Sequence, residues 1–148
     1  MEDLIEYLHK HVPQTRNMGF KAGELCADNL TLEAPLSVNL NDKLTAFGGT
    51  LATLSTIAGW TMVSMICRES KLDIDIVVAE SHIRYLAPVR CDPICAKAMR
   101  PSDADITSFL SKFDEGGFGA LTINSTIRGD QPESVVFSGR YMVKNLGL

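Results

Sequence analysis

Two adjacent glycines, Gly48 and Gly49, stand near the start of a long segment without charged side chains. If this segment is a helix, the backbone N–H groups of its first turn have no intrahelical partner and lie at the positive end of the helix dipole. The missing side chains let a carbonyl oxygen approach these N–H groups, which could then polarise it. The glycines could instead serve only to pack the helix start against a strand, and the sequence leaves both interpretations open.

A second candidate for chemistry is His82, which lies in a segment of alternating polar and apolar residues. A neutral imidazole can act as a base or orient a water molecule at about pH 7. The alternation places His82 on the face of a strand opposite Ile83 and Tyr85. If those two side chains pack inward, His82 points toward solvent or a partner subunit, and a structural histidine is the alternative.

The composition is typical of a globular chain. Residues 1–148 are 45% hydrophobic and 22% charged, so a single domain with a sizeable core is predicted. The net charge of −4 and the scattered basic residues argue against a nucleic acid as partner. The first residues include two acids rather than a basic region and an apolar run, so no secretory signal is predicted and a cytoplasmic location is expected.

The cysteines do not form a common metal or redox motif. Only two of the four are close together, and their three-residue gap matches neither common zinc nor common redox spacing. They are therefore interpreted as free thiols, and no metal or cofactor is predicted. The four are Cys26, Cys67, Cys91 and Cys95.

Residues 44–67 carry no charge and, at about 1.5 Å per residue, are long enough to cross a bilayer as a helix. Seven of these twenty-four residues are Ser or Thr and three are Gly, which weakens the gain from insertion into lipid. A helix that is apolar on nearly all sides is also what a protein needs at the centre of its own fold. A buried core helix is therefore favoured over a membrane span.

Period-two alternation on both sides of this helix predicts a largely antiparallel sheet. A short helix is expected before the first strand, and a helical turn is expected near residues 103–112. The order of elements predicts an α+β domain in which one curled antiparallel β-sheet wraps around one long central helix. The predicted strands are residues 20–26, 29–38, 72–78, 83–89, 94–99, 120–128 and 134–144.

Two segments resemble a known family. The pattern Asn41-x6-Gly48-Gly49, which leads into TAFGGTLATLSTIAGW, and the later segment SHIRYLAPV are similar to the hotdog fold of acyl-CoA thioesterases. More narrowly, they resemble a thioesterase domain that occurs alone or fused behind a GNAT-type acetyltransferase domain, in the 4-hydroxybenzoyl-CoA/phenylacetate-type thioesterase superfamily. The resemblance runs from about Pro13 to the C-terminus and implies the hotdog fold.

The resemblance implies roles for the residues around the helix start. It assigns polarisation of a thioester carbonyl to Gly48 and Gly49, and it matches Asn41 to an Asn that helps to hold the attacking water or the thioester. Other hotdog enzymes carry their acid in the loop before the helix, where Asp42 is the available carboxylate. Asn41 and Asp42 could equally be turn and helix-capping residues.

Two positions depart from the comparison motif. Phe47 replaces the His that precedes the glycines, and Thr56 stands where the helix carries a carboxylate. A threonine hydroxyl is a poor base, although it can hold a water by hydrogen bonds. These departures favour an alternative in which the protein binds an acyl thioester without hydrolysing it. A further alternative is an oligomerisation module.

The substrate that the resemblance implies is an acyl-CoA or an acyl-carrier thioester. Acyl groups bind in apolar tunnels, and Phe47, Thr56 and Trp60 are candidate substrate-binding residues, although an apolar stripe at helical spacing is also typical of a core. The family forms its active site between two subunits, so a homodimer or tetramer is expected. Neither the length of the acyl chain nor an aryl preference follows from the sequence.

Overall fold

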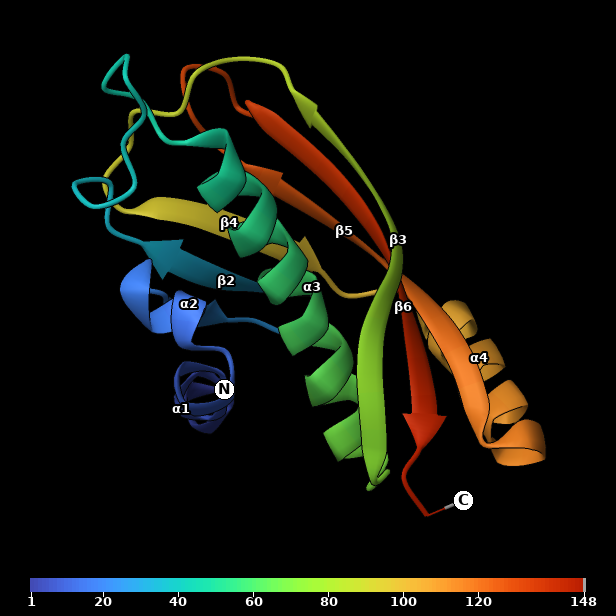
Figure 1. Ribbon diagram of the computed structural model, residues 1–148. Coiled ribbons are helices and arrows are strands. Elements are labelled where there is room, and N and C mark those ends of the chain that lie inside the picture. Colours follow the sequence, from blue (N-terminus) through green and yellow to red (C-terminus); the bar gives the residue numbers. More distant parts are fainter. Residues whose placement is uncertain (148) are drawn as a thin grey trace.

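The computed structural model describes residues 1–147, and one long helix lies at its centre (Figure 1). A six-stranded antiparallel sheet with the strand order β1-β2-β4-β5-β6-β3 curls around that helix, as predicted. The helices are α1 (Glu2–His11), α2 (Pro13–Asn17), α3 (Gly48–Glu69) and α4 (Asp103–Gly116). The strands are β1 (Lys21–Leu25), β2 (Asn29–Ala34), β3 (Ile74–Tyr85), β4 (Ile94–Met99), β5 (Phe118–Ile127) and β6 (Val135–Asn145).

The central helix α3 is apolar because the sheet covers most of its surface. Leu54, Ala58 and Val63 are completely buried in the core. By length and composition α3 could cross a membrane, but 67% of its apolar stretch is buried inside the fold. This burial agrees with the prediction of a core helix. The helix begins at Gly48, because residues 44–47 belong to the preceding loop.

Residues 74–85 form the single strand β3, where the sequence predicted two strands. A β-bulge follows Val78 and moves one residue out of the pairing with β6. Ile76 lies opposite Val143, and after the bulge Ile83 lies opposite Phe137, so apolar side chains of both halves pack against the core. The predicted break was wrong, because a bulge restores the alternation without ending the strand. β3 is an edge of the sheet.

Other element boundaries follow local chemistry. Strand β2 ends at Ala34, because Pro35 has no backbone N–H to continue the ladder. Residues 35–47 then form a long loop that leads to α3. The strand predicted at residues 94–99 is confirmed. Helix α2 was not predicted, although Pro13 at its first position is a typical start signal.

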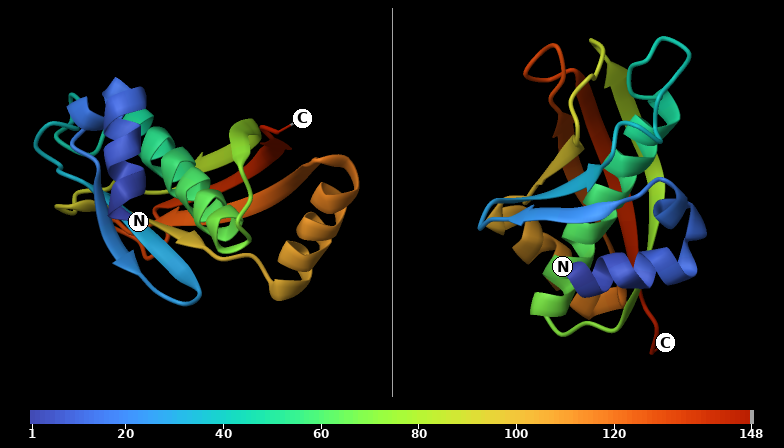
Figure 2. Two further views of the ribbon diagram at one scale, coloured as in Figure 1. Left: turned by 90° about the horizontal axis from the view of Figure 1, so that it is seen from below. Right: turned by 90° about the vertical axis from the view of Figure 1, so that its left-hand side faces the viewer.

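Two further helices flank the wrapped core (Figure 2). The predicted helical turn is the longer helix α4, whose N-terminus is capped where the Ser102 hydroxyl accepts a hydrogen bond from the N–H of Asp105. Helix α4 ends at Gly116, and its C-cap residue Gly117 has a φ of 67°. Helix α1 buries Leu4 and Leu8 in the core. Helix α1 and the start of β3 border the partly exposed C-terminal half of α3.

Candidate active site at the N-terminus of α3

The first turn of α3 presents backbone N–H groups that are not used within the protein. Phe47 is the N-cap residue and its side chain makes no capping hydrogen bond. The first N–H with a partner is that of Leu51, which donates to the carbonyl oxygen of Phe47 at 3.1 Å. Among residues 1–147, no group accepts a hydrogen bond from the N–H groups of Gly48, Gly49 or Thr50. These donors and the helix dipole form a site for a carbonyl oxygen or an oxyanion.

A side chain would have different consequences at the two glycines. A Cβ at Gly49 would collide with the ring of Phe47, so this glycine is needed for the aromatic ring to lie over the helix start. A Cβ at Gly48 would lie 3.8 Å from Cε1 of Tyr85, which is ordinary contact. Tight packing therefore explains the glycine at position 49. It does not require a glycine at position 48, where Tyr85 borders the open space.

Tyr85 is the residue at this site that the sequence analysis did not single out for chemistry. It is the last residue of β3, and its hydroxyl donates a long hydrogen bond of 3.4 Å to the carbonyl oxygen of Gly48. The phenol is 53% exposed and the nearby Phe47 ring is 52% exposed, so both border an open helix start. The sequence could have indicated Tyr85, because the alternation placed it on the inward face of the strand with Ile83.

The side chain of Asn41 is occupied within its own loop. Its carbonyl oxygen accepts hydrogen bonds from the N–H groups of Lys43 at 2.9 Å and Thr45 at 3.1 Å. Its amide nitrogen donates to the Thr45 hydroxyl at 2.8 Å and, at 3.5 Å, to the carbonyl oxygen of Ala46. The structure therefore places Asn41 as a turn residue that orders the loop before α3, which is one of the two roles predicted for it.

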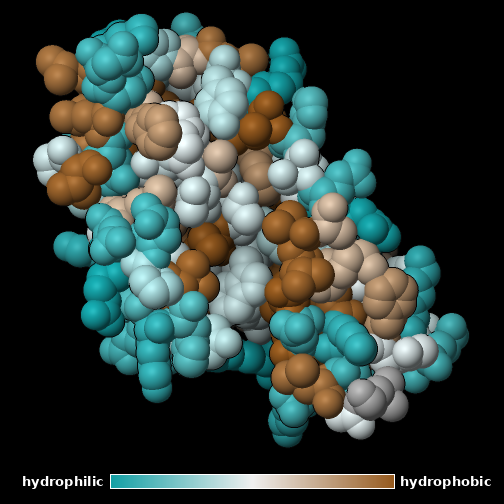
Figure 3. Space-filling model, in the orientation of Figure 1, coloured by the Kyte–Doolittle hydropathy of each residue, from teal (hydrophilic) through white to brown (hydrophobic). Residues whose placement is uncertain are grey.

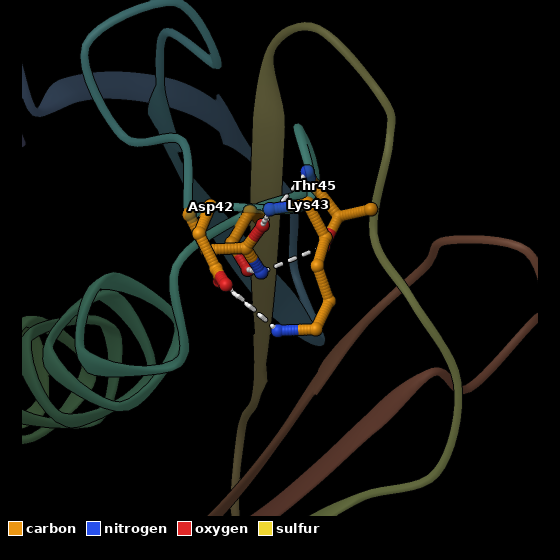
Figure 4. Close-up of polar contacts among 5 residues, drawn as sticks. Asp42, Lys43 and Thr45 are labelled. Atoms are coloured by element: carbon orange, nitrogen blue, oxygen red, sulfur yellow. Dashed lines mark hydrogen bonds and ion pairs between the residues drawn. The ribbon is translucent and has the colours of Figure 1, made fainter.

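Asp42 lies in the same loop, where its carboxylate accepts a hydrogen bond from the neighbouring Lys43 (Figure 4). Its carboxylate pairs with the Lys43 ammonium at 3.0 Å, and both side chains are highly exposed. An exposed ion pair of this kind contributes little to stability. Asp42 is thus free to change partners, although the structure holds it against Lys43 rather than against the first turn of α3.

His82 lies on the other side of the sheet from the glycines. It is exposed and opposite Ser138 of β6, while its neighbours Ile83 and Tyr85 face inward. The predicted orientation of His82 toward solvent or a partner is confirmed. Within one chain the sheet therefore separates His82 from Gly48 and Gly49.

Asn39 anchors the loop to the helix, and the sequence analysis did not find it. Its side chain is 4% exposed, and its amide nitrogen donates to the carbonyl oxygens of Met18 at 2.9 Å and Pro35 at 2.7 Å. Its amide oxygen accepts a hydrogen bond of 3.0 Å from the Thr50 hydroxyl in the first turn of α3. The loop and the helix start are thus held in one arrangement by a buried polar side chain.

Thr56 and Trp60, the predicted substrate-binding residues further along α3, lie on its partly exposed face. The Thr56 hydroxyl donates to the carbonyl oxygen of Ala52 at 2.8 Å. Trp60 stacks on Tyr7 of α1, with ring centroids 6.2 Å apart, and lines a groove of about 560 Å³. Residues 1–147 contain no group of three or more His, Cys, Asp or Glu side chains positioned to hold a metal ion.

Comparisons with known proteins identify the fold and the family. A protein of unknown function from Chlorobaculum tepidum TLS has a TM-score of 0.92 and 30% identity, with 97% of this chain and 93% of that chain covered. A "putative thioesterase" from Shewanella oneidensis has a TM-score of 0.85 and 29% identity, with 95% and 94% covered. A thioesterase from Haemophilus influenzae, at 16% identity and a TM-score of 0.68 over 96% and 91% of the two chains, shares the fold.

The family match covers nearly the whole chain. The model described as "Putative thioesterase (yiiD_Cterm)" matches residues 1–145. The neighbours with thioesterase names have the same curled sheet around a central helix, which is the hotdog fold. The chain therefore belongs to this thioesterase family and has the hotdog fold predicted from its sequence.

Proposed function

We propose that the protein hydrolyses an acyl thioester, either an acyl-CoA or an acyl-carrier thioester. The observation that carries this proposal is the set of unused N–H groups of Gly48, Gly49 and Thr50 at the exposed start of α3. They suit the oxygen of a thioester carbonyl, on which negative charge develops when water attacks the carbon. Membership of a thioesterase family supports the same reaction.

In this proposal the aromatic side chains at the helix start complete the binding site. Tyr85 already lies beside Gly48 and carries a hydroxyl that could turn from the Gly48 carbonyl to the thioester. Phe47 covers Gly49, so its ring must rotate outward for the substrate to reach both glycines. The ring is half exposed, so this rotation meets few neighbours.

The base that activates water is assigned to Asp42, as the carboxylate in the loop next to the helix start. Asp42 would have to leave its exposed ion pair with Lys43, which costs little. Asn41 supports this role indirectly, because its side chain shapes the loop that carries Asp42. His82 is the competing candidate, and it would act only on the site of another subunit.

A homodimer or a tetramer is part of the proposal. Strand β3 is twelve residues long and forms an edge of the sheet, so one side of it presents unpaired backbone groups. Val77 and Val78 in the middle of this edge are both exposed. A second copy that pairs along β3 would cover these side chains and continue the sheet.

A second candidate function is acyl-thioester binding without hydrolysis. Two observations favour it: the ring of Phe47 lies over Gly49, and Thr56 on the exposed face of α3 offers a hydroxyl rather than a carboxylate. In this case the protein would hold the ligand and release no thiol. A role as an oligomerisation module requires neither binding nor turnover.

The test is the release of coenzyme A from a panel of short, long and aryl acyl-CoAs, measured by chromatography. We expect Asp42→Asn to lower kcat/KM by about 100-fold or more if Asp42 is the base. The matched control is Asp130→Asn, which breaks a different exposed ion pair, with Arg90, and should leave the rate unchanged. Loss of activity in His82→Ala instead would move the base to the partner subunit.

The alternatives give distinct results in the same experiment. Binding of acyl-CoA with no coenzyme A released from any substrate would support the non-hydrolytic function. An oligomer that neither binds nor cleaves any thioester would support the oligomerisation module and would overturn the proposal.

A further inference from the structure

A groove lies between α1, α3 and the start of β3, next to the central helix. It has a volume of about 560 Å³, within the range of small-molecule sites. Its apolar lining includes Leu8 on α1, Ile57 and Trp60 on α3, and Ile76 on β3. Figure 3 shows this face of the molecule, where weakly polar side chains follow α3 and hydrophobic ones border it along β3. The groove lies toward the C-terminal half of α3, away from Gly48.

A partly exposed stripe on α3 connects the helix start to this groove. Its members recur every three or four residues, so they share one face of the helix. They are Gly49, Ala52, Thr53, Thr56, Ile57 and Trp60. The hydroxyls of Thr53 and Thr56 donate to the carbonyl oxygens four residues earlier, each at 2.8 Å. With these donors used inside the helix, the stripe offers mainly methyl groups and backbone to a ligand.

Ser64 lies at the far end of the groove. Its side chain is part of the groove lining, the residue is only 5% exposed, and its hydroxyl has no hydrogen-bond partner among residues 1–147. A buried hydroxyl without a partner is costly, and a hydrocarbon chain offers it none, so Ser64 marks the point where the groove stops suiting an apolar ligand. Beyond Ser64 the lining becomes polar, with Arg68 and Asp73.

The distances along α3 indicate how many carbons an acyl chain bound there would have. At about 1.5 Å per residue, Trp60 lies about 16 Å from Gly49 along α3, and Ser64 lies about 22 Å from it. An extended acyl chain advances about 1.3 Å per carbon, as tetrahedral C–C bonds of about 1.5 Å require. A chain of about 13 carbons therefore reaches Trp60, and one of about 18 carbons reaches Ser64.

We propose that the stripe and the groove bind the acyl chain of a long-chain thioester, with an optimum of about 14 to 16 carbons. The thioester lies at Gly48 and Gly49, the chain follows the stripe past Thr56, and its methyl end lies beside Trp60 under Tyr7 of α1. Ser64 and the polar lining beyond it set the upper limit. This inference rests on the proposed function, because it takes the thioester position from it.

Trp60 provides a direct measurement of occupancy, because it is the single tryptophan in the chain. S-tetradecyl-CoA is a thioether that cannot be hydrolysed, so its binding is independent of turnover. We expect it to shift the Trp60 emission to shorter wavelength in a saturable manner, because the chain displaces water from the indole. S-butyl-CoA has the same head group but a chain too short to reach Trp60, and it should leave the emission unchanged.

Two variants that place a bulky side chain on the stripe test whether the acyl chain follows it. Thr56→Phe and Ile57→Phe should each weaken the tetradecyl response at least tenfold. The matched control is Thr107→Phe on α4, an exposed threonine outside the groove, which should bind like the wild type. Thermal melts establish that the variants fold, and two independent positions keep the test decisive if one of them does not.

Ser64→Ala tests the upper limit on the length of the acyl chain. Without the unpartnered hydroxyl this end of the groove is less polar, so the affinity for chains of about 18 carbons should rise relative to that for about 14 carbons in a series of S-alkyl-CoAs. Ser55→Ala is the control, because Ser55 is another buried serine on α3 whose hydroxyl has no partner in residues 1–147, but it does not line the groove. Ser55→Ala should bind the series of alkyl chains with the same length preference as the wild type.

The outcomes separate this inference from the proposed function. A tetradecyl response with no coenzyme A released from any acyl-CoA would leave the inference standing and overturn hydrolysis. Turnover that is fastest with butanoyl-CoA, or equal emission shifts with butyl and tetradecyl ligands, would overturn the inference and leave hydrolysis standing. An unchanged tetradecyl affinity in both Thr56→Phe and Ile57→Phe would also overturn it.

Discussion

The phenol of Tyr141 on β6 packs directly against Gly59 in the middle of α3. Its hydroxyl donates to the carbonyl oxygen of Thr56 at 2.7 Å, and the side chain is completely buried. A Cβ at Gly59 would lie 2.6 Å from Cζ of Tyr141 and closer still to the hydroxyl oxygen. Glycine within a helix costs about 1 kcal/mol relative to alanine, and here it permits the close approach of the sheet to the helix.

Gly59→Ala should therefore destabilise the protein, although alanine is the better helix former. We expect the free energy of unfolding to fall by about 2 to 4 kcal/mol, because Tyr141 must move or lose its hydrogen bond. Urea unfolding followed by circular dichroism measures this change. Gly116→Ala in α4 is the matched control, because its Cβ would meet no atom within 4 Å, and it should change stability by less than about 1 kcal/mol.

Tyr85→Phe tests the hydroxyl beside Gly48. If this hydroxyl binds the thioester oxygen, kcat/KM should fall by about 10- to 100-fold, comparable to or less than the loss of one oxyanion donor. The stability should change little, because the 3.4 Å hydrogen bond to Gly48 is long and exposed. Steady-state kinetics and a thermal melt measure the two effects. An unchanged kcat/KM would restrict Tyr85 to a packing role.

Val77→Lys tests the proposed assembly through β3. A charged side chain in the middle of an edge strand opposes pairing with a second copy. Light scattering during size-exclusion chromatography should show a smaller species than the wild type. Val38→Lys is the control, because Val38 is also an exposed valine but lies in the loop before α3. A monomeric wild type, or an unchanged mass in Val77→Lys, would contradict assembly along this edge.

Stability should decrease at alkaline pH because of Cys67. Burial raises the pKa of its thiol from 9.0 to about 12. Between these values the unfolded chain has released the proton while the folded chain still holds it. The contribution of this thiol is therefore fully present below pH 9 and is lost as the pH rises, by up to about 1.4 kcal/mol per pH unit. Burial also raises the pKa of Tyr141, which acts in the same direction above its ordinary value of 10.0.

Urea unfolding at pH 8, 9 and 10 measures this slope. Cys67→Ala should lower stability at every pH but flatten the decrease between pH 9 and 10. Cys91→Ala is the control, because the exposed Cys91 should leave the slope unchanged. A decrease of equal size in both variants would assign it to another group.

Much of the fold was predictable from local pattern. The uncharged segment predicted the core helix, because a helix that is apolar on nearly all sides must be shielded from water, and its Ser, Thr and Gly content argued against lipid as the shield. Residues 94–99 were predicted as a strand at their observed bounds, with Asp92-Pro93 as the turn signal before them. The break predicted within β3 was wrong, because a bulge depends on pairing with β6, which local alternation does not contain.

The candidate site was predictable only in part. The position of Gly48 and Gly49 in the first turn of α3 and the outward face of His82 followed from residue type and period, and both positions agree with the structure. The hydrogen bonds of Asn39 to Met18 and Thr50 could not be predicted, because they join different segments of the chain, 21 and 11 residues apart.

The sequence by itself thus determined most of the elements, the burial of the long helix and the family, because these depend on residue type, local period and motif. Only the tertiary structure decided which side chains border the helix start and where the helix is left uncovered. Tyr85 reaches Gly48 through the length of β3, and the groove beside Trp60 exists because α1 and β3 leave part of α3 open. These relations depend on the distances at which packed elements approach one another, and no local segment encodes such distances.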